Sequence, residues 1–246
     1  MAIEEFECCS SDNAFFNRRM TLGFYGDYVI NRHLETVHDK DIDYTKLLTH
    51  AGIVAMNFCD RLAIFSTLGV TRLSLNTSLG AFNLDDTHPL FEIETLSSFS
   101  YSVGAKAKLW SYKKFSLGAV GQYFSTSPRI KRLYIASGAS SYPDKVLKTH
   151  YSEWQLALGV SYHYNARLIP YGAVKYAHAH WKLNNGKRFI IETNTNTFLH
   201  NLRNQRPWGY ALGLTYYPIL FDCFMILAEI RFLDETAIHL NLQTRF

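Results

Sequence analysis

The chain contains 246 residues, of which 48% are hydrophobic and 15% are aromatic, and its formal net charge is +4 at neutral pH. No stretch reaches the ~18 uninterrupted apolar residues that a spanning helix needs, which excludes a helical membrane protein but leaves open a membrane barrel, whose strands are only half apolar. The basic residues are scattered rather than clustered, so we expect no nucleic-acid partner.

The first residues, MAIEEFECC, are acidic and contain no apolar signal-peptide core. Two explanations are open. Either the protein is not exported, or the chain is a mature form to which a start methionine has been added. The rest of the sequence favours the second explanation.

Several segments alternate between apolar and small or polar residues with a period of two, which is typical of β-strands. The clearest segment, SSFSYSVGAKAKLW, places Phe99, Tyr101 and Val103 on one face and small residues on the other. We predict about ten strands, each near the ~9–11 residues that a tilted membrane strand requires. Their ranges are 18–31, 47–58, 62–75, 96–110, 115–126, 150–164, 168–183, 207–217, 223–233 and 236–246.

The connections between these segments alternate in length. Short turns follow residues 58, 110, 164 and 217, whereas the segments 32–46, 76–95, 127–149 and 184–206 are long and polar. Only Asp234-Glu235 is short on the long side. Short periplasmic turns and long extracellular loops are the anatomy of an outer-membrane barrel, and an even strand count brings both termini to the periplasmic side. Asn184-Asn185-Gly186 is a hairpin signal, so strand seven has a second candidate course into KRFIIET.

The face opposite the large apolar residues consists mostly of Gly, Ala and Ser. A β-sandwich would bury its large apolar residues, whereas a membrane barrel turns them toward lipid and keeps a crowded interior. The 16 Tyr and 17 Phe fit either an ordinary β-rich protein or aromatic girdles at two membrane interfaces. We therefore predict an all-β, transmembrane, antiparallel up-and-down barrel over residues 18–246, preceded by a periplasmic segment, residues 1–17.

Four stretches resemble one known family. These are GFYGDYVINRHLETVHDKD in the first strand, NFCDRLAIFSTLGVT around the first short turn and the strand after it, and IPYGAVKYAHAHW and LAEIRFLDETAIHLNLQTRF in the late strands. They resemble the chlamydial major outer membrane protein family, which consists of outer-membrane porins. Members of that family are longer, so the chain resembles a shortened member with fewer strands. The resemblance implies a bacterial outer-membrane location and a porin role.

The alternation also predicts which polar residues face the barrel interior. The candidates are Asp27, Lys106, Lys108, Glu153, Gln155, His163, Lys175, Glu229, Arg231, His239, Asn241, Gln243 and Arg245. Eight-stranded barrels are filled by side chains and sixteen-stranded barrels contain a water channel, so ten strands fall between these cases. Two interpretations stay open: an ion-paired plug, and a narrow pore lined by both signs of charge.

The four cysteines all fall near the predicted periplasmic rim. Cys8 and Cys9 precede the first strand, Cys59 lies in the first short turn, and Cys223 follows the last short turn. The periplasm is oxidising and permits disulfides. Free thiols, a pair such as Cys8 or Cys9 with Cys59, and cross-links to other envelope proteins are all open. The family resemblance also suggests the cross-linked envelope.

Candidate catalytic and metal-binding residues are few. Asp85, Asp86 and His88 in the loop NLDDTHPLF could activate water, as outer-membrane proteases do, but all three belong to one loop of turn-forming residues. His178 and His180 share a strand face without an evident third ligand. The chain contains no P-loop, GxGxxG or CxxC motif. We therefore expect no enzyme activity, no metal and no cofactor.

The chain ends on HLNLQTRF, an alternating strand that closes on an aromatic residue. We expect this strand to pair with the first one near Gly23–Tyr28, because an open edge cannot exist in a membrane. Phe246 resembles the C-terminal signal by which the outer-membrane assembly machinery recognises barrels. The predicted function is a porin-like barrel for small solutes or ions, or a structural part of a disulfide-linked envelope. The alternatives are a surface interaction protein that uses its loops and, remotely, an outer-membrane hydrolase.

Overall fold

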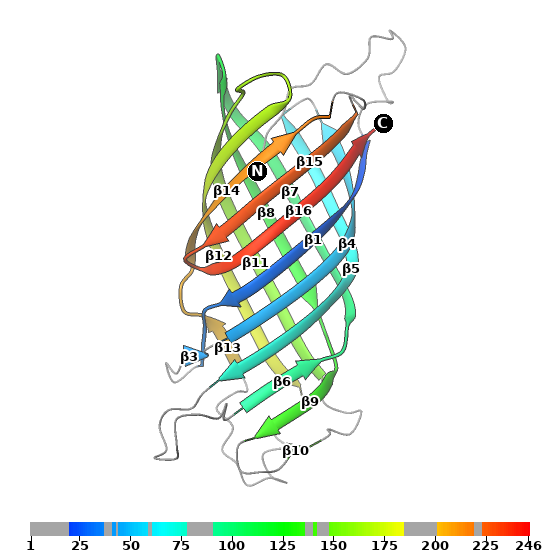
Figure 1. The fold of residues 1–246 in the computed structure, drawn as a ribbon, viewed down its shortest axis with the longest axis vertical. Coiled ribbons are helices and arrows are strands. Elements are labelled where there is room, and N and C mark those ends of the chain that lie inside the picture. Colours follow the sequence, from blue (N-terminus) through cyan, green and yellow to red (C-terminus); the bar gives the residue numbers. More distant parts are fainter. Residues whose placement is uncertain are drawn as a thin grey trace.

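The computed structural model describes residues 20–36, 41–42, 44–58, 61–77, 91–135, 140–141, 148–184, 201–218 and 223–246. Every regular element in these residues is a β-strand (Figure 1). None of them forms a helix that is long and apolar enough to cross a membrane. Residues 1–17, which we predicted to be a separate periplasmic segment, lie outside the described residues.

Ten long strands form a closed antiparallel ring. They are β1 (Met20–Arg32), β4 (Tyr44–Phe58), β5 (Leu62–Thr77), β7 (Ser98–Tyr112), β8 (Phe115–Thr126), β11 (Lys148–Tyr162), β12 (Leu168–Asn184), β14 (Trp208–Tyr216), β15 (Phe224–Phe232) and β16 (Glu235–Arg245). Each strand pairs with the next one along the chain, and β16 pairs with β1. The predicted ten-strand barrel is confirmed, and the strand ends differ from the predicted ones by only a few residues.

The closing pair follows the predicted register. Gly23 lies opposite Gln243 and Tyr28 lies opposite Ile238. At the very end of the chain, the Phe246 amide donates a hydrogen bond to the Met20 carbonyl, 2.9 Å away. The C-terminal strand is therefore held along its whole length by the first strand.

Six short strands extend one end of the barrel, and the sequence analysis did not anticipate them. They are β2 (Leu34–Thr36), β3 (Asp41–Ile42), β6 (Phe91–Thr95), β9 (Ile130–Ile135), β10 (Ser140–Ser141) and β13 (Asn201–Asn204). All of them come from the long connections, and Figure 1 shows most of them at its lower end, opposite the C-terminus. Segments of two to six residues are too short to give a clear period-two signal.

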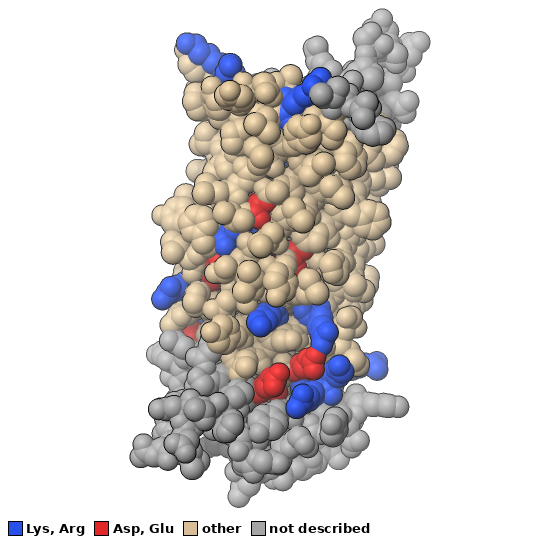
Figure 2. All heavy atoms as spheres, in the orientation of Figure 1, with Lys and Arg blue, Asp and Glu red and all other residues tan. Residues whose placement is uncertain are grey.

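Large apolar side chains face outward along the ring, as the alternation predicts. Phe24 is 73% exposed and Leu68 is 61% exposed, whereas the inward Thr71 and Ser102 are fully buried. Figure 2 shows that uncharged residues cover most of this face, with a larger group of charged residues toward its lower end, a few basic ones at the top and a few charged atoms between the uncharged side chains at mid-height. Such an apolar band matches the hydrocarbon core of a bilayer.

Aromatic side chains stack at both ends of this band. Trp110 and Tyr112 stack near the short turns, with ring centroids 5.8 Å apart. Toward the other end, the Tyr176 ring lies between Trp154 and Trp208, at 5.3 and 5.0 Å. Aromatic rings of this kind favour the boundary between lipid and water, so the barrel has an interface at each end.

Glycines in the wall make room for large side chains inside. A Cβ atom on Gly213 would lie 2.4 Å from the Tyr171 hydroxyl oxygen, and one on Gly104 would lie 2.5 Å from the Phe65 ring. Both contacts are too close for any larger residue unless the ring moves. The small residues of the inner face are therefore needed for the packing of the lumen.

The first prediction concerns how deeply two outward-facing residues of β16 lie in the membrane. Leu240 is 54% exposed in the middle of β16, and Thr244 lies on the same face near the end of that strand. We expect Leu240→Arg to lower the free energy of unfolding by about 2–4 kcal/mol, and Thr244→Arg by only about 0–1 kcal/mol, because a charge costs most at the bilayer centre. Urea unfolding in liposomes measures both values. Equal losses would contradict the proposed depth of β16 in the membrane.

Candidate functional site in the barrel lumen

The lumen contains a cavity of about 150 Å³, large enough for several water molecules. Nine of the predicted inward residues lie around it: Asp27, Lys106, Glu153, Gln155, Lys175, Glu229, Arg231, His239 and Asn241. They come from β1, β7, β11, β12, β15 and β16, so charges from most of the ring converge on one space. The remaining wall is mixed: apolar residues such as Ile53, Phe65 and Val120 alternate with polar ones such as Arg32, Thr67 and Gln122.

Four other predicted inward residues lie away from this cavity. Lys108 is buried in β7, and Gln243 is buried near the end of β16. His163 lies at the short-turn end, where its Nε2 atom is 3.3 Å from the Ser116 hydroxyl. Arg245 is half-buried at the last position of β16. The alternation thus predicted which residues face inward, but it did not predict how far along the barrel axis each one lies and therefore which ones meet.

One interaction crosses the whole lumen. Arg32 at the end of β1 forms an ion pair with Glu153 of β11 and donates a hydrogen bond to the Tyr151 hydroxyl. In the ring order, β1 and β11 are five positions apart among ten, so these groups come from opposite walls. Arg32 also binds Glu235 through both Nε and a terminal nitrogen. Arg32 and Glu153 therefore form a bridge across the lumen near the end of β1.

Further ion pairs connect this bridge to the neighbouring wall. Lys175 of β12 contacts Glu235 and lies 2.7 Å from Asp234. Arg231 of β15 is 3.1 Å from Glu235 and also forms an ion pair with Asp27 of β1. We call the connected set of Arg32, Glu153, Lys175, Arg231, Asp234, Glu235, Asp27, Glu229 and His239 the lumen network.

The lumen network continues toward the cavity. His239 Nδ1 lies 3.4 Å from Asp27, and the Tyr171 hydroxyl donates a 2.6 Å hydrogen bond to Glu229. With the histidine neutral, the network contains five carboxylates and three bases. Lys106, a fourth base on the cavity wall, lies 5.5 Å above the Phe65 ring, where a cation–π contact holds it. Both signs of charge thus face the same small volume.

A β-bulge explains why the sequence analysis missed Arg32. The pairing of β1 with β16 shifts register between Val29 and Asn31. Strict alternation from Asp27 would turn Arg32 outward, but the extra residue reverses the alternation and turns it into the lumen. Asn31 stabilises this irregularity, because its side-chain oxygen accepts a hydrogen bond from the Thr45 amide. No residue type in this stretch marks the bulge.

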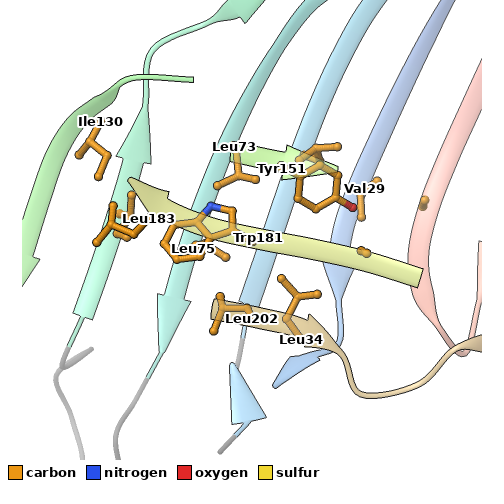
Figure 3. Packing of buried hydrophobic residues seen from close by; sticks show 13 residues of the cluster. Val29, Leu34, Leu73, Leu75, Ile130, Tyr151, Trp181, Leu183 and Leu202 are labelled. Carbon is orange, nitrogen blue, oxygen red and sulfur yellow. The ribbon is translucent and has the colours of Figure 1, made fainter. Parts of the chain in front are cut away.

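A large apolar cluster closes the lumen beyond the network, toward the end with the long connections. Trp181 is fully buried at its centre and packs with residues such as Leu73, Leu75, Tyr151 and Leu202 (Figure 3). Leu73 is on β5 and Leu202 is on β13, so this cluster also joins separate parts of the wall. We had expected large apolar residues to face lipid. At this end of the barrel that expectation is wrong.

Other predicted sites are only partly described. Cys223 is exposed and free, whereas Cys8, Cys9 and Cys59 lie outside the described residues, as do Asp85, Asp86 and His88. His178 and His180 lie on the outer face, and the His178 ring is 6.0 Å from Trp154. Among the described residues, no group of three His, Cys, Asp or Glu side chains could hold a metal ion. Phe246 is 60% exposed at the end of the chain.

Comparison with known proteins identifies clear relatives. No family model matches the chain. The major outer membrane porin, serovar A, of Chlamydia trachomatis is 23% identical, with 92% of this chain and 85% of the relative covered. The major outer membrane porin of Chlamydia psittaci is 25% identical, with 91% and 84% covered. The alignment with the first relative spans 340 positions, more than this chain contains, so that relative has segments that this chain lacks.

The comparison with solved structures found partial similarity to two outer-membrane proteins. The COG4313 outer membrane channel from Pseudomonas putida F1 has a TM-score of 0.48 at 8% identity, with 96% of this chain and 100% of that chain covered. The outer membrane protease OmpT from Escherichia coli has a TM-score of 0.45 at 8% identity, with 96% and 99% covered.

The second prediction concerns how much the Arg32–Glu153 bridge across the lumen stabilises the protein. We expect Arg32→Met to lower the free energy of unfolding by about 3–5 kcal/mol, because it leaves buried Glu153 without its basic partner and removes one of the three bases around buried Glu235. Arg72→Met is the matched control: Arg72 pairs with Glu94 but its side chain is 45% exposed, so we expect a loss of about 0–1 kcal/mol. Urea unfolding of both variants measures the difference. A similar loss in both would show that the bridge contributes no more than a surface pair.

Proposed function

This chain is a shortened, divergent relative of the chlamydial major outer membrane porins, and we propose that it works as a narrow porin that passes small hydrophilic solutes or ions. It lies in the bacterial outer membrane. The observation that supports the proposal most directly is the placement of nine polar residues around a cavity in the middle of a lipid-facing barrel.

The lumen network limits what can pass. Arg32 and Glu153 meet from opposite walls of the lumen. The apolar cluster around Trp181, which we call the Trp181 cluster, fills the lumen next to them, on the side of the long connections. Solutes therefore move only when side chains at these two levels shift, which favours ions and very small molecules over sugars or peptides. Mixed charges along a narrow path reduce the cost of dehydration for either sign of ion.

The third prediction concerns conductance. We expect the wild-type protein to give small, discrete current steps in planar bilayers. Arg32→Ala should give larger steps because it removes the group that spans the lumen, and Arg32→Ala with Trp181→Ala should give the largest. Arg72→Ala, which changes an arginine outside the lumen, should resemble the wild type.

Heat-modifiable migration in gels confirms that each variant is folded before its current is recorded. A correctly folded wild-type protein that stays silent would overturn the porin proposal, even if the double variant conducts. Enlarged steps in Arg72→Ala as well would show that the change does not act through the lumen.

A structural role in the envelope is the second candidate, and the exposed thiol of Cys223 favours it. We propose that this thiol forms disulfides with other envelope proteins, and that the assembly machinery recognises Phe246. We also propose that the chain has no hydrolase activity. Asp85→Ala and His88→Ala should then leave every measured activity unchanged.

The fourth prediction tests the cross-link. Envelopes isolated under conditions that block thiols should contain the chain in high-molecular-weight bands on non-reducing gels, and reductant should convert these bands to monomer. Cys223→Ser should reduce them, while folding and conductance stay unchanged. Equal bands in wild type and variant would assign the cross-link to another cysteine.

A further inference from the structure

Basic side chains gather on the outer face of the barrel, next to its long connections. Along β11, Thr149 and Tyr151 face inward, so Lys148 and His150 face outward; along β12, Trp181 faces inward, so His180 and Lys182 face outward. Arg129 precedes the buried Ile130 and is exposed. We call Arg129, Lys148, His150, His180 and Lys182 the outer basic patch.

The pairing of strands places basic residues directly opposite each other in this patch. Arg129 lies opposite Lys148 in an isolated bridge, and His150 lies opposite Lys182. Lys148 and His150 are two residues apart on one strand, so the two pairs are also neighbours. Like charges at directly opposite positions destabilise a sheet. Among the described residues, no carboxylate forms an ion pair with Arg129, Lys148 or Lys182.

Other charged positions at this end of the barrel are paired differently. Arg72 forms an ion pair with Glu94, and Arg203 forms one with Glu35 at 2.8 Å. Carboxylates therefore accompany arginines elsewhere at the same end. In the outer basic patch, no described acidic side chain offsets the repulsion between the basic groups. An anion from outside the protein could offset it instead.

The position of the patch indicates where that anion comes from. Trp154 lies four residues further along β11 on the same outward face, and it belongs to the row formed with Tyr176 and Trp208. Such a row marks the boundary between hydrocarbon and headgroups. The basic side chains lie just beyond it, at the level of lipid headgroups on the side of the long connections. A soluble anion would not require this placement.

We propose that the outer basic patch binds the phosphorylated headgroup of a glycolipid in the outer leaflet. The oxygen atoms of a phosphate group placed between Arg129, Lys148 and Lys182 would accept charge-assisted hydrogen bonds from all three side chains. His150 is already positioned by the Ser127 hydroxyl, whose oxygen lies 2.9 Å from its Nδ1 atom, and it completes the rim. The acyl chains would then lie along the Trp154 row. This binding is specific to one side of the barrel, unlike the general contact of its apolar band with lipid.

The test compares two double variants of the full chain. Lys148→Gln with Lys182→Gln removes two charges of the patch, and Lys113→Gln with Lys114→Gln removes two from the turn at the opposite end of the barrel. Refolded proteins are titrated with detergent micelles that contain phosphorylated lipid A, with the same lipid after removal of its phosphates, or with inorganic phosphate alone. The temperature of the heat-modifiable transition reports binding.

We expect phosphorylated lipid A to raise the transition temperature of the wild type and of the turn variant equally. The patch variant should bind roughly thirtyfold more weakly, since each lysine near an anionic lipid surface contributes about fivefold. Without lipid, the patch variant should be as stable as the wild type or more stable, because it loses a repulsion, so poor folding cannot imitate the result.

Three outcomes would overturn the proposal. Equal binding by the patch and turn variants would remove the role of the patch. Equal protection by the dephosphorylated lipid would show that the acyl chains alone bind. Equal protection by inorganic phosphate would assign the patch to a soluble anion. The test reads binding rather than current, so its outcome does not depend on whether the barrel conducts.

Discussion

The structure depends on the closure of the sheet by β1 and β16. In hydrocarbon, every backbone N–H and C=O group needs a partner within the protein, and a sheet satisfies this condition only when it has no edge. The pairing of Thr21 with Arg245 through that of Arg32 with Glu235 supplies the last set of partners. Once the ring is closed, alternate side chains must face either lipid or the lumen. The chemistry of the two faces follows from this geometry.

Closure also fixes how far apart the walls are. The diameter of a barrel increases roughly linearly with the number of strands. With ten strands, the guanidinium of Arg32 reaches the carboxylate of Glu153 on the opposite wall. Buried ion pairs are costly to desolvate unless several partners share the charge. Here Glu235 accepts contacts from Arg32, Lys175 and Arg231. The lumen network is therefore a consequence of strand number as much as of residue type.

The sequence predicted the ring much better than it predicted the site. Ten alternating segments and sorted loop lengths follow from repeated local patterns, and local patterns can be read directly from the chain. Arg32 could not be found in this way, because a bulge at Val29–Asn31 reverses its direction. Glu235 was assigned to a turn, yet it is fully buried among three bases. Trp181 has the same parity as the inward Lys175, but the alternation did not show that it would be fully buried in an apolar cluster rather than among polar lumen residues.

These residues share one property: their environment is set by segments that are distant in the sequence. Arg32 and Glu153 are separated by half the ring, and the Trp181 cluster includes residues of β2, β5, β6, β9 and β13, most of them from the extended end of the barrel. Strand alternation specifies direction but not depth, and depth decides which inward groups meet. The same reasoning applies outside. The outer basic patch arises because strand pairing brings Lys148 opposite Arg129 and Lys182 opposite His150, and we propose that lipid phosphates offset these basic groups. Register, rather than composition, therefore determines both the interior and the exterior chemistry of this barrel.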